Sequence, residues 1–215
     1  MATTDVQQLR EDYQRAALSL PDTDPDPIVQ FRRWFEEAVA SEVPEPNAMT
    51  VATASPDGVP SARVVLLKDY DAAGFVFYTN YESQKGRELD ANPRAAAVFV
   101  WLDLERQVRI EGAVERISAE QSTAYYHRRP KKSQIGAWAS DQSRVIEDRA
   151  VLEEREAALN AQYADAEQLP RPAHWGGYRI RPRRIEFWQG RSSRLHDRIN
   201  YRREAGAWVR ERLAP

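Results

Sequence analysis

The segment 194–198 (RLHDR) holds the densest group of side chains that could bind an anion. Residues two apart in an extended strand face the same way, so Arg194, His196 and Arg198 would line one face, and Leu195 and Asp197 the other. Two guanidiniums beside an imidazole suit an anionic ligand that accepts hydrogen bonds. From spacing alone, a solvated polar strand face is the commoner explanation of such a pattern.

A second group of potential phosphate donors surrounds Pro130. Tyr125 and Arg129 are four residues apart in a segment with helical character, so they share one face of the expected helix. Ser133 follows the break that Pro130 introduces. A phenol, a guanidinium and a hydroxyl can all donate to phosphate oxygens. An ordinary surface helix often carries the same pair, so this group alone does not identify a site.

Arg63 and Lys68 place a cation near each end of an expected strand, 59–69. Strict alternation puts the two side chains on opposite faces. They would share one ligand only if the strand ends, bulges or twists between them. The alternative is a core strand with charged ends.

Some side chains suit a planar ring. Gln107 lies on the polar face of its expected strand, and its amide can both donate and accept, as a flavin ring edge requires. Trp188 could stack on such a ring, although a buried core tryptophan is the commoner case. Gln142 and Ser143 form a polar loop dipeptide with no independent signal.

Other kinds of site are disfavoured. His127 and His174 lack Asp, Glu or His partners at ligand spacing, so no metal site is predicted. No glycine-rich phosphate loop occurs. The range 179–184 contains four arginines, which suggests an RNA patch. Its alternation with isoleucines and the slightly negative net charge favour a solvated strand face, so no nucleic-acid partner is expected.

The composition indicates a folded protein without cysteine. The chain has 215 residues, a hydrophobic content of 42% and a formal net charge of −2. The absence of cysteine excludes disulfides, thiolate nucleophiles and cysteine-ligated metals. The N-terminal residues 1–13 are polar, and the longest apolar run, 95–102, is too short to span a bilayer. We expect a soluble, cytoplasmic protein with no membrane partner.

Short strands separated by turns are expected over 49–117 and 178–213. Helical spacing marks 26–43, 83–92, 118–130, 133–139 and 146–163. Asp26, Ser83 and Ser118 are the expected N-caps. The lack of regular strand–helix alternation argues against a doubly wound parallel sheet. We predict a mainly β, α+β fold, an antiparallel barrel decorated with helices. Residues 1–25 would form a flexible N-terminal segment and 26–215 a single domain.

Taken in order, several segments resemble the pyridoxine/pyridoxamine 5′-phosphate oxidase family. They are RVVLLK (63–68), FYTN (77–80), ERQVRIEG (105–112), YYHRRPKKSQIGAWAS (125–140), DQS (141–143), WGGYRI (175–180), EFWQGRSSRLHDR (186–198) and ERLAP (211–215). RLHDR, SQIGAW and EFWQG in this order are together highly specific. The resemblance runs from about Asp26 to Pro215.

The resemblance implies an FMN-binding split β-barrel that works as a homodimer, with two flavin sites at the subunit interface. Some contacts to each flavin would come from the partner subunit, and Arg63 with Lys85 would hold the FMN phosphate. The expected FMN-binding positions are Arg63, Val64, Val65, Leu66, Lys68, Tyr78, Thr79, Gln84, Lys85, Gln107, Gln142, Ser143, Trp188 and Arg198.

The same resemblance implies a substrate site. Arg194 and His196 would hold the pyridine ring and its 3-hydroxyl as the catalytic residues, with Arg194 assisting proton removal. A mobile N-terminal segment could cover the substrate. The expected substrate-binding positions are Arg10, Tyr13, Lys68, Tyr125, Arg129, Ser133, Arg194 and His196.

The implied reaction is FMN-dependent oxidation of pyridoxamine or pyridoxine 5′-phosphate to pyridoxal 5′-phosphate. A hydride would pass from the substrate C4′ carbon to flavin N5, and dioxygen would be reduced to hydrogen peroxide. The amine substrate would also release ammonia. Two alternatives stay open: another split-barrel flavin or deazaflavin oxidoreductase, and a carrier or sensor that binds flavin or pyridoxal phosphate without turnover.

One position departs from the family pattern. The family usually has Ser-Arg-Lys where this chain has Ser83, Gln84 and Lys85. Gln84 therefore lacks a cation that normally helps to bind the flavin phosphate. Because a charge-assisted hydrogen bond is roughly twice as strong as a neutral one, we predict weaker FMN retention without loss of function.

Overall fold

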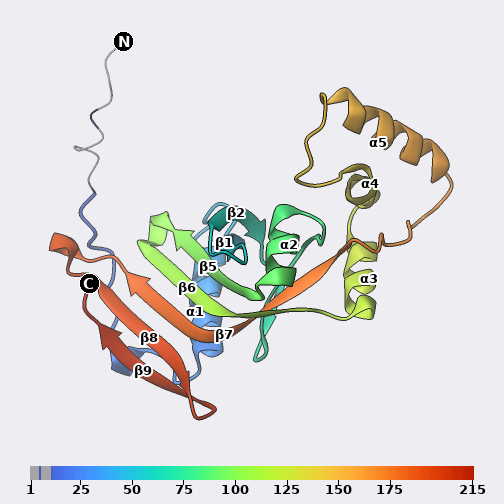
Figure 1. Ribbon diagram of the computed structural model, residues 1–215. Helices are drawn as coiled ribbons and strands as arrows, with labels where there is room; N and C mark the ends of the chain where they lie inside the picture. Colours follow the sequence, from blue (N-terminus) through green and yellow to red (C-terminus); the bar gives the residue numbers. More distant parts are fainter. Residues whose placement is uncertain (1–4, 6–10) are drawn as a thin grey trace. The chain divides into compact units, whose positions relative to one another are not determined.

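The structure is a computed structural model, and it describes Asp5 and residues 11–215 (Figure 1). The helices are α1 (Pro27–Ala40), α2 (Gln84–Ala91), α3 (Ala119–Arg128), α4 (Lys131–Ala139) and α5 (Ala150–Gln162). The strands are β1 (Ala48–Ala54), β2 (Pro60–Leu66), β3 (Asp69–Asp71), β4 (Gly74–Asn80), β5 (Arg94–Trp101), β6 (Arg106–Arg116), β7 (Trp175–Gln189), β8 (Asp197–Glu204) and β9 (Ala207–Leu213). Short 3₁₀ turns include η4 (Ser192–Arg194).

The strands form hydrogen-bonded neighbours in the order β2-β1-β5-β6-β7-β4-β3, and β8 pairs with both β7 and β9. The pairs β1–β2, β3–β4, β4–β7, β7–β8 and β8–β9 are antiparallel. This confirms the predicted α+β class with antiparallel strands and peripheral helices.

The chain divides into two compact units. The terminal unit comprises the described residues up to Pro46 with Val98–Ile110 and Arg183–Pro215, and the central unit comprises Asn47–Ala97 and Glu111–Pro182. Strands β5, β6 and β7 contribute residues to both units.

The three expected N-caps are confirmed. The Asp26 side chain accepts a hydrogen bond from the main-chain N–H of Ile28 at 2.8 Å, and Pro27 begins α1. Ser83 caps α2 and Ser118 caps α3 in the same way. Each cap satisfies a main-chain donor that the first helical turn leaves unpaired, so these helices begin where the sequence indicates.

Aromatic side chains fill the core of the terminal unit. Phe31 on α1 lies 5.2 Å from Phe99 between ring centroids, and Trp34 meets Phe187 edge-on at 5.2 Å. Tyr201 on β8 is also fully buried against Phe187. The apolar stripe of α1 therefore packs on the inner faces of the strands, as its helical spacing predicts.

Two glycines at the start of β7 allow close packing in the central unit. A Cβ atom on Gly176 would lie 2.1 Å from the Tyr81 hydroxyl, and one on Gly177 would lie 2.6 Å from the side chain of Ile117. The strand expected from the sequence begins only at Tyr178, whereas β7 begins at Trp175 and includes both glycines. Here they extend β7 and let it approach its neighbours.

The expected strand 59–69 is divided. β2 ends at Leu66, Leu67 donates its main-chain N–H to Asn47, and Lys68 donates its own to Val76. The chain thus leaves its pairing with β1 at the end of β2 and pairs with β4 from Lys68 onward. Strict alternation between Arg63 and Lys68 does not apply, because the strand ends between them.

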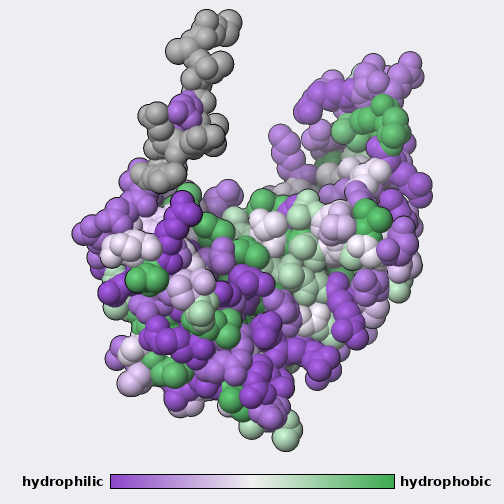
Figure 2. Space-filling model, turned by 60° about the vertical axis from the view of Figure 1, so that its left-hand side comes forward, coloured by the Kyte–Doolittle hydropathy of each residue, from purple (hydrophilic) through white to green (hydrophobic). Residues whose placement is uncertain are grey.

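The surface in Figure 2 is mainly hydrophilic, with small scattered hydrophobic patches. Val59, Val64, Leu102, Val145 and Leu195 are the most exposed large apolar side chains among the described residues. Exposed apolar side chains scattered in this way are normal for a globular protein.

Candidate functional site

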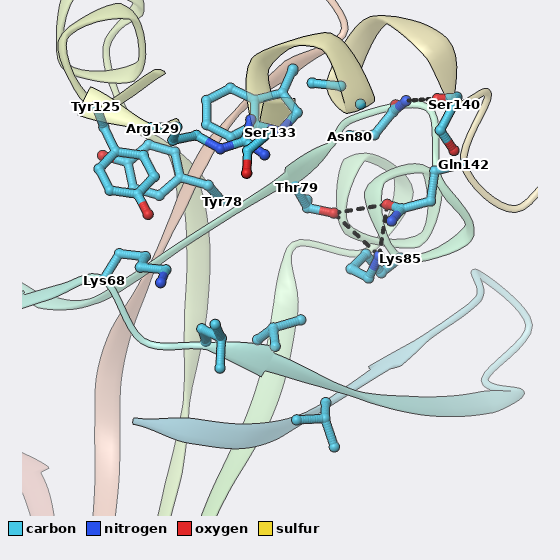
Figure 3. Close-up of a pocket in the computed structure, with 16 residues that line it drawn as sticks. Lys68, Tyr78, Thr79, Asn80, Lys85, Tyr125, Arg129, Ser133, Ser140 and Gln142 are labelled. Carbon is cyan, nitrogen blue, oxygen red and sulfur yellow. Dashed lines mark hydrogen bonds between the residues drawn. The ribbon is translucent and has the colours of Figure 1, made fainter. Parts of the chain in front are cut away.

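A pocket of about 450 Å³ lies within the central unit (Figure 3). Its walls come from the end of β2, from β4, α2, α3 and α4, and from the loop that follows α4. It is lined by Val64, Val65, Leu66, Lys68, Tyr78, Thr79, Asn80, Lys85, Tyr125, Arg129, Ser133, Gly136, Ala137, Ser140, Gln142 and Trp175. All four residues expected to grip a substrate phosphate, and most of those expected to bind FMN in this unit, are among them.

Lys68 faces this pocket from the segment after β2, and Tyr125, Arg129 and Ser133 face it from α3 and α4 (Figure 3). Tyr125 lies on α3, Arg129 is the C-cap residue of α3, and Ser133 lies in the first turn of α4. The turn at Pro130 brings the hydroxyl of Ser133 to the same pocket as Arg129. Four side chains that can donate to an anion therefore share one cavity.

Arg129 is held in an unusual environment. Its guanidinium carbon lies 4.6 Å from the centre of the Trp175 ring, and its Nη1 is buried without a hydrogen-bond partner among the described residues. Burial lowers the pKa of Arg129, although Tyr125 and Tyr126 oppose the shift. An arginine remains charged under such conditions, so this buried donor requires an acceptor that the described residues do not supply.

Aromatic rings build one wall of the pocket. Tyr78 stacks on Tyr125 with centroids 4.0 Å apart, and it lies nearly parallel to Trp175 at 5.3 Å. Burial, with a contribution from the nearby Tyr125, raises the pKa of Tyr78 to about 12. Tyr78 therefore keeps its hydroxyl proton at neutral pH and can act as a donor.

Lys85 is a buried cation in the same pocket. Its Nζ donates to Thr79 Oγ1 at 3.2 Å, Ser83 Oγ at 3.3 Å and Gln142 Oε1 at 3.1 Å, and no carboxylate pairs with it among the described residues. Burial and the neighbouring charge of Arg63 lower the pKa of Lys85 to about 8. Three neutral oxygens orient this ammonium without neutralising it, which favours an anionic ligand.

Arg63 lies beside this cation but does not line the pocket. Its guanidinium donates to Thr53 and Ser61, and it lies 3.5 Å from a carboxylate oxygen of Glu88. Burial opposes the ionisation of Glu88, but hydrogen bonds from Ser61, Thr53 and Gln84 and the charge of Arg63 lower its pKa to about 2. Glu88 therefore holds the position of Arg63.

Gln84 and Ser143 lie outside the pocket lining. The Gln84 amide is exposed and donates to the other oxygen of Glu88 at 2.9 Å. Ser143 is exposed with a left-handed φ of 70°, whereas its neighbour Gln142 accepts hydrogen bonds from Thr79 and Lys85. The side chain of Gln142 thus lines the pocket, whereas Ser143 does not.

A second group of expected residues lies within the terminal unit. The rings of Trp188 and His196 have centroids 4.5 Å apart, and Tyr13 meets Trp188 edge-on at 5.9 Å. Gly190 permits this arrangement, because a Cβ atom there would lie 2.8 Å from the Tyr13 ring. Arg10 lies outside the described residues.

Arg198 and Gln107 lie on strands of the same unit. Arg198 makes two hydrogen bonds to Glu186, at 2.8 and 3.0 Å, and a third to the main-chain oxygen of Ala214. Glu186 is 3% exposed and also accepts from Arg109. Gln107 is half-buried on β6.

The expectation that Arg194, His196 and Arg198 share one face of an extended strand is wrong. β8 begins only at Asp197, and Ser192–Arg194 forms a 3₁₀ turn. Ser193 and Arg194 have φ values of 56° and 62°, so the chain curls instead of extending. Arg194 is exposed in this turn, and Leu195 is exposed beside it.

Three residues that shape these sites were not among the expected site residues. Trp175 supports Arg129, Glu88 holds Arg63, and Glu186 holds Arg198. The only available signal for Glu186 was its alternation with Trp188 on one strand. Glu88 and Trp175 are distant in sequence from the residues they contact, so spacing could not reveal them.

No group of three or more His, Cys, Asp or Glu side chains in the described part of the chain could hold a metal ion. None of the described helices has the length and apolar character that a membrane crossing requires.

Family models cover most of the chain. Residues 35–163 match the model described as pyridoxamine 5′-phosphate oxidase. Residues 175–215 match the model of the pyridoxine 5′-phosphate oxidase C-terminal dimerisation region. These matches confirm the resemblance seen in the motifs.

Curated relatives and solved structures agree with these models. The chain is 61% identical over 209 residues to a pyridoxine/pyridoxamine 5′-phosphate oxidase of Salinibacter ruber, covering 96% of this chain and 97% of that protein. It is 59% identical over 213 residues to pyridoxine/pyridoxamine 5′-phosphate oxidase 1 of Ralstonia nicotianae, covering 99% and 100%.

Two solved structures show the fold. PhzG from Burkholderia lata, in complex with tetrahydrophenazine-1-carboxylic acid, has a TM-score of 0.87 at 33% identity, covering 94% of this chain and 100% of that one. A pyridoxamine 5′-phosphate oxidase-related, FMN binding protein from Nostoc punctiforme has a TM-score of 0.69 at 16% identity, covering 86% and 97%. The expected split-barrel fold is thereby confirmed.

Proposed function

The chain belongs to the pyridoxamine 5′-phosphate oxidase family, and on that premise we propose that it makes pyridoxal 5′-phosphate with FMN as its cofactor. The substrates are pyridoxamine 5′-phosphate and pyridoxine 5′-phosphate. Dioxygen is the final acceptor and gives hydrogen peroxide, and hydrolysis of the oxidised amine releases ammonia.

The buried, unpaired Nη1 of Arg129 is the observation that carries this proposal. A phosphate oxygen supplies the acceptor that this atom needs. Lys68, Tyr125 and Ser133 line the same cavity and provide further donors. Phosphate bound at this position would fix the remote end of the substrate, and binding energy from a remote group can position the reacting carbon.

The donors around Lys85 fit the phosphate of FMN. Lys85 is a buried ammonium that no described carboxylate neutralises, and Arg63 is the neighbouring cation. Thr79 and Gln142 orient Lys85, and residues 64–66 at the end of β2 line the same pocket. When bound, FMN would supply the capacity to accept a hydride from the substrate and to pass electrons to dioxygen.

Residues of the terminal unit would act at the substrate ring. Arg194 and His196 would hold the pyridine ring and its 3-hydroxyl, with Arg194 assisting proton removal. Trp188 and Arg198 would contact the flavin, together with Gln107. The N-terminal segment, through Arg10 and Tyr13, would cover the substrate and exclude water. The contact of Tyr13 with Trp188 and His196 supports this role for Tyr13.

The match of residues 175–215 to a dimerisation region supports a homodimer as the working form. In this assembly the partner subunit would contribute some of the flavin contacts. We also propose that the protein works in the cytoplasm, and that residues 26–215 act as one functional domain preceded by an N-terminal segment.

A second candidate is oxidation of a reduced phenazine carboxylate. It is supported by the 33% identity and the TM-score of 0.87 to PhzG, whose solved structure holds tetrahydrophenazine-1-carboxylic acid. The two candidates differ in whether the substrate carries a phosphate, and the four phosphate donors of the pocket favour the B6 phosphates.

The test is an aerobic assay of the purified protein loaded with FMN. Pyridoxamine 5′-phosphate, pyridoxine 5′-phosphate, pyridoxamine without phosphate and a reduced phenazine carboxylate are compared, and aldehyde and peroxide are measured. We expect equimolar pyridoxal 5′-phosphate and peroxide from the two phosphorylated substrates. Turnover of the phenazine alone would favour the second candidate, and flavin binding without turnover would indicate a carrier.

A further inference from the structure

One ring nitrogen of His196, Nδ1, accepts a hydrogen bond from the main chain. The main-chain N–H of Arg191 donates to His196 Nδ1 at an N–N distance of 3.2 Å. A main-chain N–H can only donate, so Nδ1 must present its lone pair. A neutral imidazole carries one proton, which must therefore be on Nε2.

The turn between these two residues brings them together. Leu195 donates its main-chain N–H to Ser192, and both Ser193 and Arg194 adopt left-handed φ values. Consecutive left-handed residues other than glycine are uncommon, because the Cβ atom crowds the main chain. Strain of this kind is retained where the surrounding structure requires it, often at functional sites. Here the turn places the His196 side chain within hydrogen-bond distance of the Arg191 amide.

Packing holds the ring in this orientation. The Trp188 ring lies 4.5 Å from the imidazole centroid at an interplanar angle of 40°, and Tyr13 lies 6.0 Å away. Nε2 has no hydrogen-bond partner among the described residues. The Nε2 edge of the half-buried ring is therefore available to a ligand. In the tautomer described above, this edge carries the N–H.

We propose that the main-chain amide of Arg191 is a positioning group that fixes His196 as the Nε2–H tautomer, so that His196 donates a hydrogen bond to an anionic oxygen on the substrate ring. The identity of that oxygen, the 3-oxygen of a pyridine, rests on the proposed function. In this state His196 has no free lone pair, so it does not act as the base that removes a substrate proton. Donation to an oxygen that gains negative charge would stabilise the reacting substrate.

Nitrogen NMR of the ¹⁵N-histidine-labelled, FMN-loaded protein measures the tautomer directly. The chain has three histidines, so the loss of one signal set in His196→Gln assigns that residue. We expect a protonated Nε2 and an unprotonated Nδ1 at neutral pH. A protonated Nδ1, in either the other tautomer or the imidazolium, would overturn the proposal.

Ser193 offers a matched pair of variants, because its side chain is exposed and lies outside the proposed binding and catalytic groups. Ser193→Gly keeps the left-handed conformation available, whereas Ser193→Val disfavours it. We expect Ser193→Gly to keep the Nε2–H tautomer. Ser193→Val should show both tautomers and a several-fold lower kcat, with FMN content and far-ultraviolet circular dichroism unchanged.

If both Ser193 variants kept a single Nε2–H tautomer, the turn would not be the device that fixes it, and the proposal would fail. The NMR result does not depend on turnover. A wild-type protein with the Nε2–H tautomer but no oxidation of pyridoxamine 5′-phosphate would reject the proposed function while supporting the tautomer assignment.

Discussion

Half-buried Arg129 and buried Trp175 form a cation–π pair in which the guanidinium carbon lies 4.6 Å from the ring centroid. The pair orients Arg129 in a cavity where its Nη1 lacks a hydrogen-bond partner among the described residues. A planar guanidinium can stack on the indole and donate to a phosphate at the same time, which the rounded ammonium of lysine cannot do.

Replacing Arg129 should therefore weaken phosphate recognition. We expect Arg129→Lys to lower kcat/KM for pyridoxamine 5′-phosphate by roughly 10- to 100-fold, because hydrogen bonds to charged groups contribute ~1.5–3 kcal/mol. Steady-state kinetics measure the change. Arg128→Lys is the matched control, since Arg128 is exposed at the end of α3. An equal loss with unphosphorylated pyridoxamine would show that Arg129 does not act on the phosphate.

The lowered pKa of Lys85 predicts that FMN binding depends on pH. Its pKa in the protein without ligand is about 8, below the ordinary value of 10.5, so it loses its charge as pH rises through 8. The phosphate of FMN is already a dianion there, since its second pKa is about 6. Bound phosphate favours the charged lysine, so binding takes up protons and FMN affinity falls above pH 8, by up to about tenfold per pH unit.

Calorimetry in buffers of different ionisation enthalpy measures this proton uptake. Lys85→Met should remove the proton uptake and weaken FMN binding at pH 7. Proton uptake that persisted in Lys85→Met would assign the effect to another group.

We predict that a cation at position 84 increases the affinity for FMN. Gln84 lies in the first turn of α2, and its amide donates to Glu88. An arginine there would add a cation and reach further than glutamine, so Gln84→Arg should bind FMN more tightly, by several-fold. Fluorescence quenching of FMN titrated with apoprotein measures the affinity. Gln121→Arg, at an exposed site on α3, controls for net charge; equal affinities of wild type and Gln84→Arg would disprove the prediction.

Gly190 should be required for docking of the N-terminal segment. A Cβ atom there would lie 2.8 Å from the ring of Tyr13. We expect Gly190→Ala to displace Tyr13 and to raise KM for the substrate several-fold while FMN content stays unchanged. An unchanged KM in Gly190→Ala would argue against a role for Tyr13 at the substrate.

Local signals in the sequence gave reliable predictions. Asp26 with Pro27, Ser83 and Ser118 begin their helices as expected, because an N-cap depends only on residues two or three positions away. Tyr125, Arg129 and Ser133 were grouped correctly for the same reason, since a single helix end and turn bring them together.

Long-range relationships could not be predicted from spacing. Glu88 accepts hydrogen bonds from Thr53 and Ser61, which are 35 and 27 residues earlier in the chain. The turn at Ser193 and Arg194 was also missed, because glycine usually marks a left-handed residue and none occurs there. Its conformation depends on packing around His196, so the expected alternation failed.

The most direct test of the central claim is an anaerobic mixing experiment with the FMN-loaded protein and pyridoxamine 5′-phosphate, followed by admission of air. The proposed function predicts loss of the oxidised-flavin absorbance, one pyridoxal 5′-phosphate per flavin, and recovery of the absorbance with one hydrogen peroxide when oxygen enters. A flavin spectrum that stays unchanged with saturating pyridoxamine and pyridoxine 5′-phosphates would contradict it.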